Sequence, residues 1–73
     1  MSLYDKIQMM IRLDGLIRRK ATGTADDLAV RLGVSVPTIY RYLRELRNFG
    51  APIRYCAHRH CYFYEEDFRL QFN

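Results

Sequence analysis

The fold is decided by the stretch TADDLAVRLGVSVPTIYRYLREL, residues 24–46, which predicts two capped helices around a tight turn. Thr24 is a favourable N-cap residue, and the acidic pair Asp26 and Asp27 follows it, where the positive end of a helix dipole favours negative charge. A short apolar stripe then recurs at helical spacing, formed by Leu28, Ala29 and Leu32. These signals predict a helix over residues 25–32.

A second helix follows almost at once. Gly33 suits the left-handed backbone that a sharp turn between helices requires. Ser35 offers a new N-cap, and Pro37 stands in the first turn, where its missing N–H is tolerated. We expect this helix over residues 36–48.

The second helix has two chemically distinct sides. Its apolar residues recur at i, i+4 and i+7 and predict a buried stripe: Ile39, Leu43 and Leu46. Tyr42 is expected to pack in the core or against a hairpin. Three arginines fall on other faces and must point to water or to a ligand: Arg41, Arg44 and Arg47. For Arg44 and Arg47, the alternative is a solvated helix face paired with Glu45 or with aspartate neighbours.

These residues resemble the helix-turn-helix signature of bacterial transcription regulators. The resemblance rests on Ala29, Gly33 with Val34-Ser35, and Ile39, and it extends over about residues 7–64. The sequence that follows Ile39, through Gly50 to Pro52-Ile53, is similar to that of the winged-helix domains of DeoR-like and biotin-repressor-like regulators. The resemblance implies a mainly α fold with a small β-hairpin (α+β), a three-helix helix-turn-helix bundle plus a wing.

The first helix is expected over residues 2–20, with Ser2 and Asp5 at its start. Its core stripe comprises Leu3, Ile7, Met10, Leu13 and Ile17. Additional apolar residues flank that stripe, which favours either deep burial or a homodimer seam: Tyr4, Met9, Ile11 and Leu16. Asp14-Gly15 is expected to weaken the middle of this helix, with a kink as one outcome.

The last third of the chain predicts a hairpin over residues 53–64 and a tail over residues 65–73. Ile53, Tyr55, Tyr62 and Tyr64 alternate with Arg54 and Phe63, which is the period of a hairpin with one buried face and leaves Phe63 exposed. The turn falls at residues 57–60 and lacks glycine, so an irregular connection is expected. The tail is expected to pack on the domain as a strand or an extended arm, or to contact another protein.

The resemblance assigns DNA contacts to the start and the outward side of the second helix of the motif, and to the wing. The predicted DNA-binding residues are Ser35, Val36, Pro37, Thr38, Tyr40, Arg41, Arg44 and Arg59. Arg41 or Arg44 suits a bidentate contact to guanine, whereas Thr38 and Tyr40 suit phosphates. Arg59 is assigned to the DNA backbone or minor groove by analogy with other wings.

Charge and length agree with this interpretation. The 73 residues suffice for a single domain, residues 1–73, with one modest core. The formal net charge is +4, and residues 28–64 contain six arginines against one acidic residue, Glu45. A basic block of this kind favours binding to a polyphosphate. We therefore expect a sequence-selective double-stranded DNA-binding protein, a small transcriptional regulator that acts as a homodimer or with a larger partner.

Other chemistries find little support in the sequence. Neither a phosphate-binding glycine loop nor a hydrolase or metalloprotease motif is present, so we expect no enzyme and no cofactor. The segment Cys56-Ala-His58-Arg-His60-Cys61 groups four potential zinc ligands, but strand alternation and the absence of the usual paired ligand spacing argue against a metal site. A reduced cross-strand thiol pair is the expectation.

The start of the chain lacks a secretory pattern, and no apolar run is long enough for a bilayer, so a cytoplasmic protein without a membrane association is expected. The competing interpretation is a winged helix that serves as a protein-interaction or assembly module without direct DNA readout. Phe63, the wide apolar side of the first helix and the Phe/Leu tail favour that alternative. The arginines of residues 36–48 oppose it.

Overall fold

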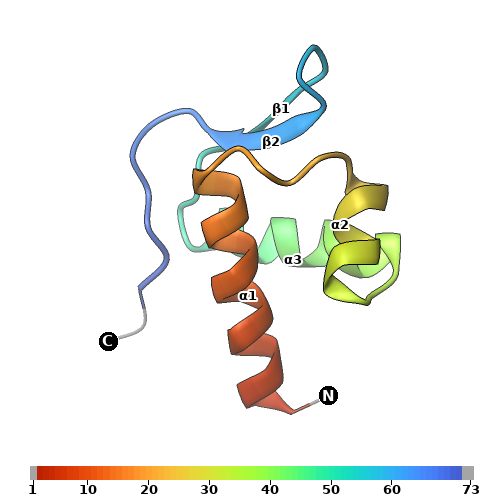
Figure 1. The fold of residues 1–73 in the computed structure, drawn as a ribbon. Coiled ribbons are helices and arrows are strands. Elements are labelled where there is room, and N and C mark those ends of the chain that lie inside the picture. The colour runs from red at the N-terminus through yellow and green to blue at the C-terminus, as the bar shows by residue number, and fades with distance from the viewer. Residues whose placement is uncertain (1, 72–73) are drawn as a thin grey trace.

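Three helices and a two-stranded antiparallel hairpin make up the fold. The computed structural model describes residues 2–71, and its elements are α1 (Leu3–Arg18), α2 (Ala25–Leu32), α3 (Val36–Asn48), β1 (Ile53–Cys56) and β2 (Cys61–Tyr64). The hairpin lies over one end of the helical bundle, and the N-terminal half of α1 extends away at the opposite end (Figure 1). The predicted architecture, mainly α with a small β wing, is confirmed.

The turn between α2 and α3 follows from its caps. Thr24 and Asp27 form a reciprocal capping box at the start of α2, with an N–H···O distance of 3.2 Å from Asp27 to the Thr24 hydroxyl. Gly33 ends α2 in the left-handed conformation, at φ 70°. The hydroxyl of Ser35 then accepts the N–H of Thr38 at 3.3 Å and caps α3. The short turn therefore fixes how α3 lies against α2.

Helix α1 is slightly shorter than expected and unkinked. Ser2 and Asp5 form its N-terminal capping box, as the sequence indicates. The helix ends at Arg18, because the chain turns at Lys20, which adopts φ 56°. The kink considered at Asp14-Gly15 does not occur: both residues are buried, and α1 runs through them as one continuous helix (Figure 1).

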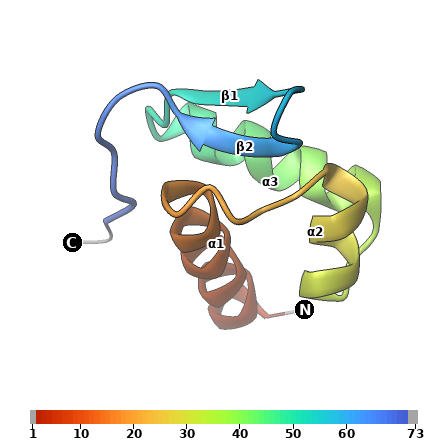
Figure 2. The ribbon, with the colours of Figure 1, turned by 45° about the horizontal axis from the view of Figure 1, so that its top comes forward.

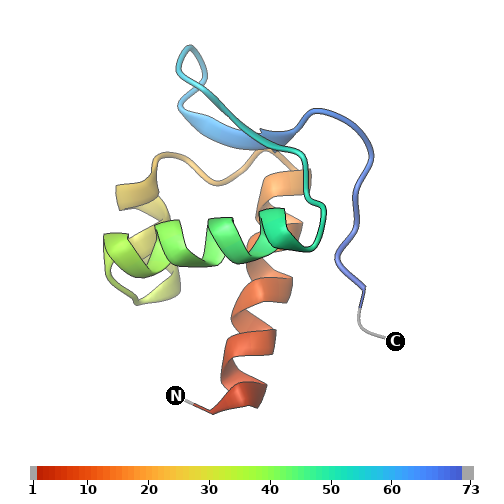
Figure 3. The same cartoon turned by 180° about the vertical axis from the view of Figure 1, so that it is seen from behind.

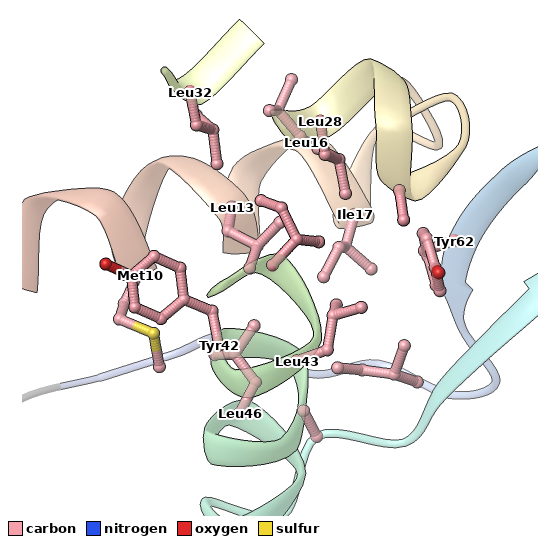
Figure 4. Close-up of a cluster of buried hydrophobic side chains, with 14 of the residues drawn as sticks. Met10, Leu13, Leu16, Ile17, Leu28, Leu32, Tyr42, Leu43, Leu46 and Tyr62 are labelled. Atoms are coloured by element: carbon pink, nitrogen blue, oxygen red, sulfur yellow. The ribbon is translucent and has the colours of Figure 1, made fainter. Parts of the chain in front are cut away.

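The core forms where the three helices and β2 meet (Figure 4). Leu13, Ile17, Leu28, Ile39 and Leu46 are fully covered, so each helix contributes to the same apolar cluster. Tyr42 is also buried there, at 2% exposure, which confirms its predicted core position. Burial of a large aliphatic side chain contributes about 1.5–3 kcal/mol, so this cluster is the main term that holds α3 in place.

The hairpin register pairs Ile53 with Tyr64 and Tyr55 with Tyr62. Two details correct the sequence prediction. Tyr55 is 42% exposed rather than buried, because it lies toward the turn and covers the ring of Tyr62, with centroids 4.8 Å apart, instead of entering the core. Phe63 is half-buried rather than exposed.

A buried threonine joins the hairpin to the loop before α2. Thr22 is 1% exposed, and its hydroxyl accepts the backbone N–H of Tyr62 at 2.8 Å. The same hydroxyl donates to the carbonyl of Gly23 at 2.8 Å. One side chain thereby satisfies an outward-facing N–H of β2 that no neighbouring strand pairs. The loop holds the hairpin against the helices (Figure 2).

A buried carboxylate ties α1 to the end of the hairpin. Asp14, at 2% exposure, accepts the Tyr64 hydroxyl at 2.7 Å and the Nε–H of Arg18 at 3.2 Å. The tail then packs on the protein without forming a strand: Phe68 contacts the Tyr64 ring edge-on and Leu70 is buried. Phe72, the last apolar residue of the predicted tail pattern, lies outside the described residues.

Tyr64→Phe is expected to destabilise the fold by about 1–3 kcal/mol at neutral pH, because the buried Asp14 carboxylate loses a hydrogen-bond donor. Urea unfolding monitored by circular dichroism measures the change. Tyr55→Phe is the matched control, since Tyr55 is exposed and its hydroxyl makes no hydrogen bond within residues 2–71. Equal losses in the two variants would contradict the assigned role of Asp14.

The same pair predicts an alkaline loss of stability. Burial, and then the hydrogen bond to Asp14, raise the pKa of Tyr64 above its usual value of 10. The folded state therefore holds this proton more tightly than the unfolded state, and the stabilisation falls as the pH rises above about 10. Thermal unfolding between about pH 9 and pH 11 should show a steeper loss for the wild type than for Tyr64→Phe. Parallel pH profiles would refute the linkage.

Candidate nucleic-acid interface

Helix α3 presents one side to the core and the other to solvent. Seen from behind, it crosses in front of α1, so its outer side faces the viewer (Figure 3). Pro37, Arg41, Arg44 and Asn48 recur every three or four positions along that side, and all four are exposed. We call these four residues the outer line of α3. An α-helix with one free polar side has the dimensions that enter a DNA major groove, which is about 12 Å wide.

The arginines of α3 make no ion pairs with the rest of the described chain. Glu45, the acidic residue within α3, turns toward α1 and bonds the Lys6 ammonium at 2.7 Å. The ion pairs among residues 2–71 therefore do not include Arg41, Arg44 or Arg47, which remain exposed. The alternative of a face neutralised by Glu45 is thus not what the structure contains.

The predicted residues of the first turn of α3 lie in unequal environments. Pro37 is exposed, whereas Val36 is partly buried and packs against the core. Ser35 is exposed, but its hydroxyl also donates to the Thr38 hydroxyl at 2.9 Å, so the two side chains engage each other at the helix start. Thr38 is itself half-buried. Ser35 and Pro37 are therefore the exposed members of this group, and the backbone N–H groups of Thr38 and Ile39 are already bonded to Ser35.

The side of α3 nearest the hairpin carries an aromatic and a further arginine. Tyr40 is 56% exposed. Burial raises the pKa of Tyr62, and the nearby phenols of Tyr40 and Tyr55 act in the same direction, while Arg47 opposes them. These interactions place Tyr40 and Arg47 beside β2. The prediction left Arg47 out of the site, although its spacing of seven from Tyr40 puts both on one line of the helix.

The tip of the hairpin carries the remaining predicted contact. Residues 57–60 form the turn, all are exposed, and Arg59 makes no ion pair within the described chain. His60 adopts φ 55° and supplies the left-handed residue for which glycine is usual. The tip lies above the start of α2 (Figure 2), and His60, after the Thr24 hydrogen bonds and Arg31, helps to hold the pKa of Asp27 below its usual value.

The possible metal site at the turn gains no support. Cys56 and Cys61 are free thiols on directly paired residues. Among residues 2–71, no group of three or more histidine, cysteine or acidic side chains is arranged to hold a metal ion. The same part of the chain contains no helix that is long and apolar enough to cross a bilayer.

A family of known proteins matches most of the chain. The family model HTH_11, described as "HTH domain", covers residues 7–59, from the middle of α1 to the wing turn. No curated protein and no solved structure matches the chain. The matched span includes every predicted DNA-contacting residue. The family assignment therefore agrees with the exposed, basic α3 and the short α2–α3 turn, and the chain belongs to the helix-turn-helix domain family of DNA-binding domains.

Proposed function

We propose that this chain reads a specific sequence in double-stranded DNA and acts as a small transcriptional regulator. The observation that carries the proposal is the row of exposed, unpaired arginines on α3, with Arg59 at the tip of the adjacent hairpin. Their cations are available to phosphates and base edges without first breaking an internal ion pair. Neutralising phosphates releases condensed counterions, which supplies most of the affinity for any duplex.

Sequence selectivity in this proposal comes from the outer line of α3. Arg41 and Arg44 project where a helix in the major groove meets base edges, and a bidentate arginine–guanine contact discriminates by about 1–3 kcal/mol. Pro37 offers an apolar contact to the DNA. Val36 offers less apolar surface to the DNA, because it packs against the core. In this proposal, Ser35, Thr38 and Tyr40 contact phosphates, as residues at these positions do in helix-turn-helix proteins, and Arg47 joins them on the hairpin side.

Arg41→Ala and Arg44→Ala are expected to relax base preference, each removing about 1–3 kcal/mol of discrimination at one position of the site. Arg59→Ala should instead weaken binding to all duplexes alike and flatten the salt dependence by about one counterion. Selection from a random duplex pool, followed by titrations at several salt concentrations, measures both effects.

Arg12→Ala is the charge-matched control for this set, because Arg12 is exposed on α1 rather than on α3 or the wing. It should leave base preference unchanged. If Arg41→Ala, Arg44→Ala and Arg59→Ala all lose the same modest affinity on every sequence, the division between base readout and backbone contact is wrong. If the wild type does not retard duplex DNA even at low salt, the proposed function itself fails.

We further propose that two copies bind together through α1. The N-terminal half of α1 and the end of α3 carry apolar side chains that reach the surface, which we call the α1 patch: Leu3, Tyr4, Ile7, Ile11 and Phe49. Leu3, Ile7 and Phe49 line one shared hollow. Leu3 is 74% and Tyr4 69% exposed, which is unusual for side chains of this size. The N-terminal half of α1 extends away from the hairpin (Figure 1), so a second copy seated there leaves the wing free. The same patch borders the outer line of α3, because Leu3 lines one hollow with Arg41 and another with Asn48.

The double variant Leu3→Ser, Tyr4→Ser is expected to convert a dimer to a monomer while the fold persists, because both residues lie outside the core. Sedimentation equilibrium measures the mass, and binding to paired half-sites about one helical turn apart should lose its cooperativity. Val30→Ser is the control: Val30 is 85% exposed, but on α2. A wild type that stays monomeric with and without DNA would overturn this part of the proposal.

The α1 patch also favours the competing function, an interaction module without DNA readout. Under that alternative, the outer line of α3 has no assigned partner. Salt-insensitive capture of another protein through the α1 patch, together with an absence of duplex binding, is the result that would favour it.

A further inference from the structure

Two thiols face each other at the base of the wing turn. Cys56, the last residue of β1, is paired directly with Cys61, the first residue of β2, and the two are free. Directly opposed residues of an antiparallel pair have Cα atoms about 4.5–5.5 Å apart. Disulfides join Cα atoms about 4.4–6.8 Å apart. The backbone of the hairpin therefore already has the spacing that a disulfide needs.

The two sulfurs differ in access. Cys56 is half-buried, so small solutes reach it, whereas Cys61 is 4% exposed. The backbone N–H of Arg59 points at the Sγ of Cys56 at 3.4 Å. Cys56 is thus the member of the pair that a small oxidant reaches first, and Cys61 is its protected neighbour.

We propose that Cys56 and Cys61 form an oxidisable dithiol, a modification site that reacts with peroxides to close a disulfide across the wing and thereby controls contact of the wing with DNA. The disulfide itself rests on the hairpin geometry alone. Its effect on DNA rests on the proposed function.

The chemistry balances with hydrogen peroxide as the oxidant. The Cys56 thiolate attacks one peroxide oxygen, the O–O bond breaks, and hydroxide leaves to give a sulfenic acid on Cys56. Cys61 then attacks the Cys56 sulfur, the S–S bond forms, and the sulfenic oxygen leaves as water. Two thiols lose two electrons and two protons, and one peroxide becomes two waters. A dithiol reductant reverses the reaction by exchange.

Oxidation acts on the residue that the proposed function places at the DNA backbone. A disulfide fixes the direction of the Cys56 side chain, so its sulfur turns toward Cys61 and the Arg59 N–H loses its partner in the turn. The turn holds His60 at positive φ, a conformation that persists only when its surroundings support it. A changed turn moves Arg59, while the α3 arginines stay in place because the helical core is untouched.

The first experiment tests the disulfide without DNA. The purified chain is treated with a small excess of hydrogen peroxide, alkylated and weighed by mass spectrometry. The expected result is an intact monomeric chain that is lighter by two hydrogen atoms, carries no alkyl group and recovers both thiols after reduction. Cys56→Ser should instead leave the buried Cys61 thiol slow to react, and Cys61→Ala should stop at a sulfenic acid on Cys56. Unreacted thiols, or a disulfide that links two chains, would overturn the proposal.

The second experiment tests the consequence. Oxidised wild-type protein should bind every duplex about threefold to tenfold more weakly than reduced protein, with a flatter salt dependence and unchanged base preference, the effect of one lost phosphate contact. Oxidation of the Arg59→Ala variant should not weaken its DNA binding further, and peroxide treatment should leave the DNA affinity of Cys56→Ser unchanged. Equal binding by the oxidised and reduced forms overturns the regulatory role. A disulfide that forms in a protein that binds no duplex refutes the proposed function but leaves the modification site standing.

Discussion

The burial of one side of α3 is the constraint on which the rest of the structure depends. Ile39, Leu43 and Leu46 are covered by α1 and α2, so the helix has no freedom to rotate about its axis. The arginines, which alternate with these residues at helical spacing, must then face outward. The arginines therefore stay in water and do not incur the free-energy cost of burying a charge, and their charges remain accessible to a ligand. The same packing that stabilises the domain therefore also orients its basic side.

The α2–α3 turn and the hairpin are both positioned relative to this packed helix. Gly33 sets the angle at which α3 leaves α2, and the Ser35 cap starts the helix at a fixed residue. The loop residue Thr22 then fastens β2 to the bundle through the Tyr62 N–H. Because each connection is short, β2 at the base of the wing and the outer line of α3 are held in a fixed arrangement. The proposed DNA contact at Arg59 lies in the turn beyond that base.

Local signals in the sequence predicted much of this arrangement. Caps, the Gly33 turn and the apolar spacing of residues 24–46 depend on neighbours in the chain, so periodicity and capping chemistry suffice to find α2 and α3. Long-range contacts were not predictable in the same way. Asp14 looked like a weak point in α1, because nothing nearby in the sequence reveals that Tyr64, fifty positions later, donates to it.

The candidate site shows the same division. The outward direction of Arg41 and Arg44 followed from helical geometry alone. In contrast, the pairing of Glu45 with Lys6, which leaves the α3 arginines unneutralised, requires α1 to lie beside α3. Alternation along β1 placed Tyr55 in the core, but alternation reports the face of a strand and not how far the core extends beneath it, so the exposed ring over Tyr62 was missed.

The central claim is that the outer side of α3, with the wing tip, is the surface that meets a duplex. A backbone NMR titration with a selected DNA duplex tests this most directly. The account predicts salt-sensitive shift changes concentrated at residues 35–48 and 57–60, with the N-terminal half of α1 and the tail unaffected at constant oligomeric state. Changes confined to α1 or the tail, or shifts that do not respond to DNA at low salt, would contradict it.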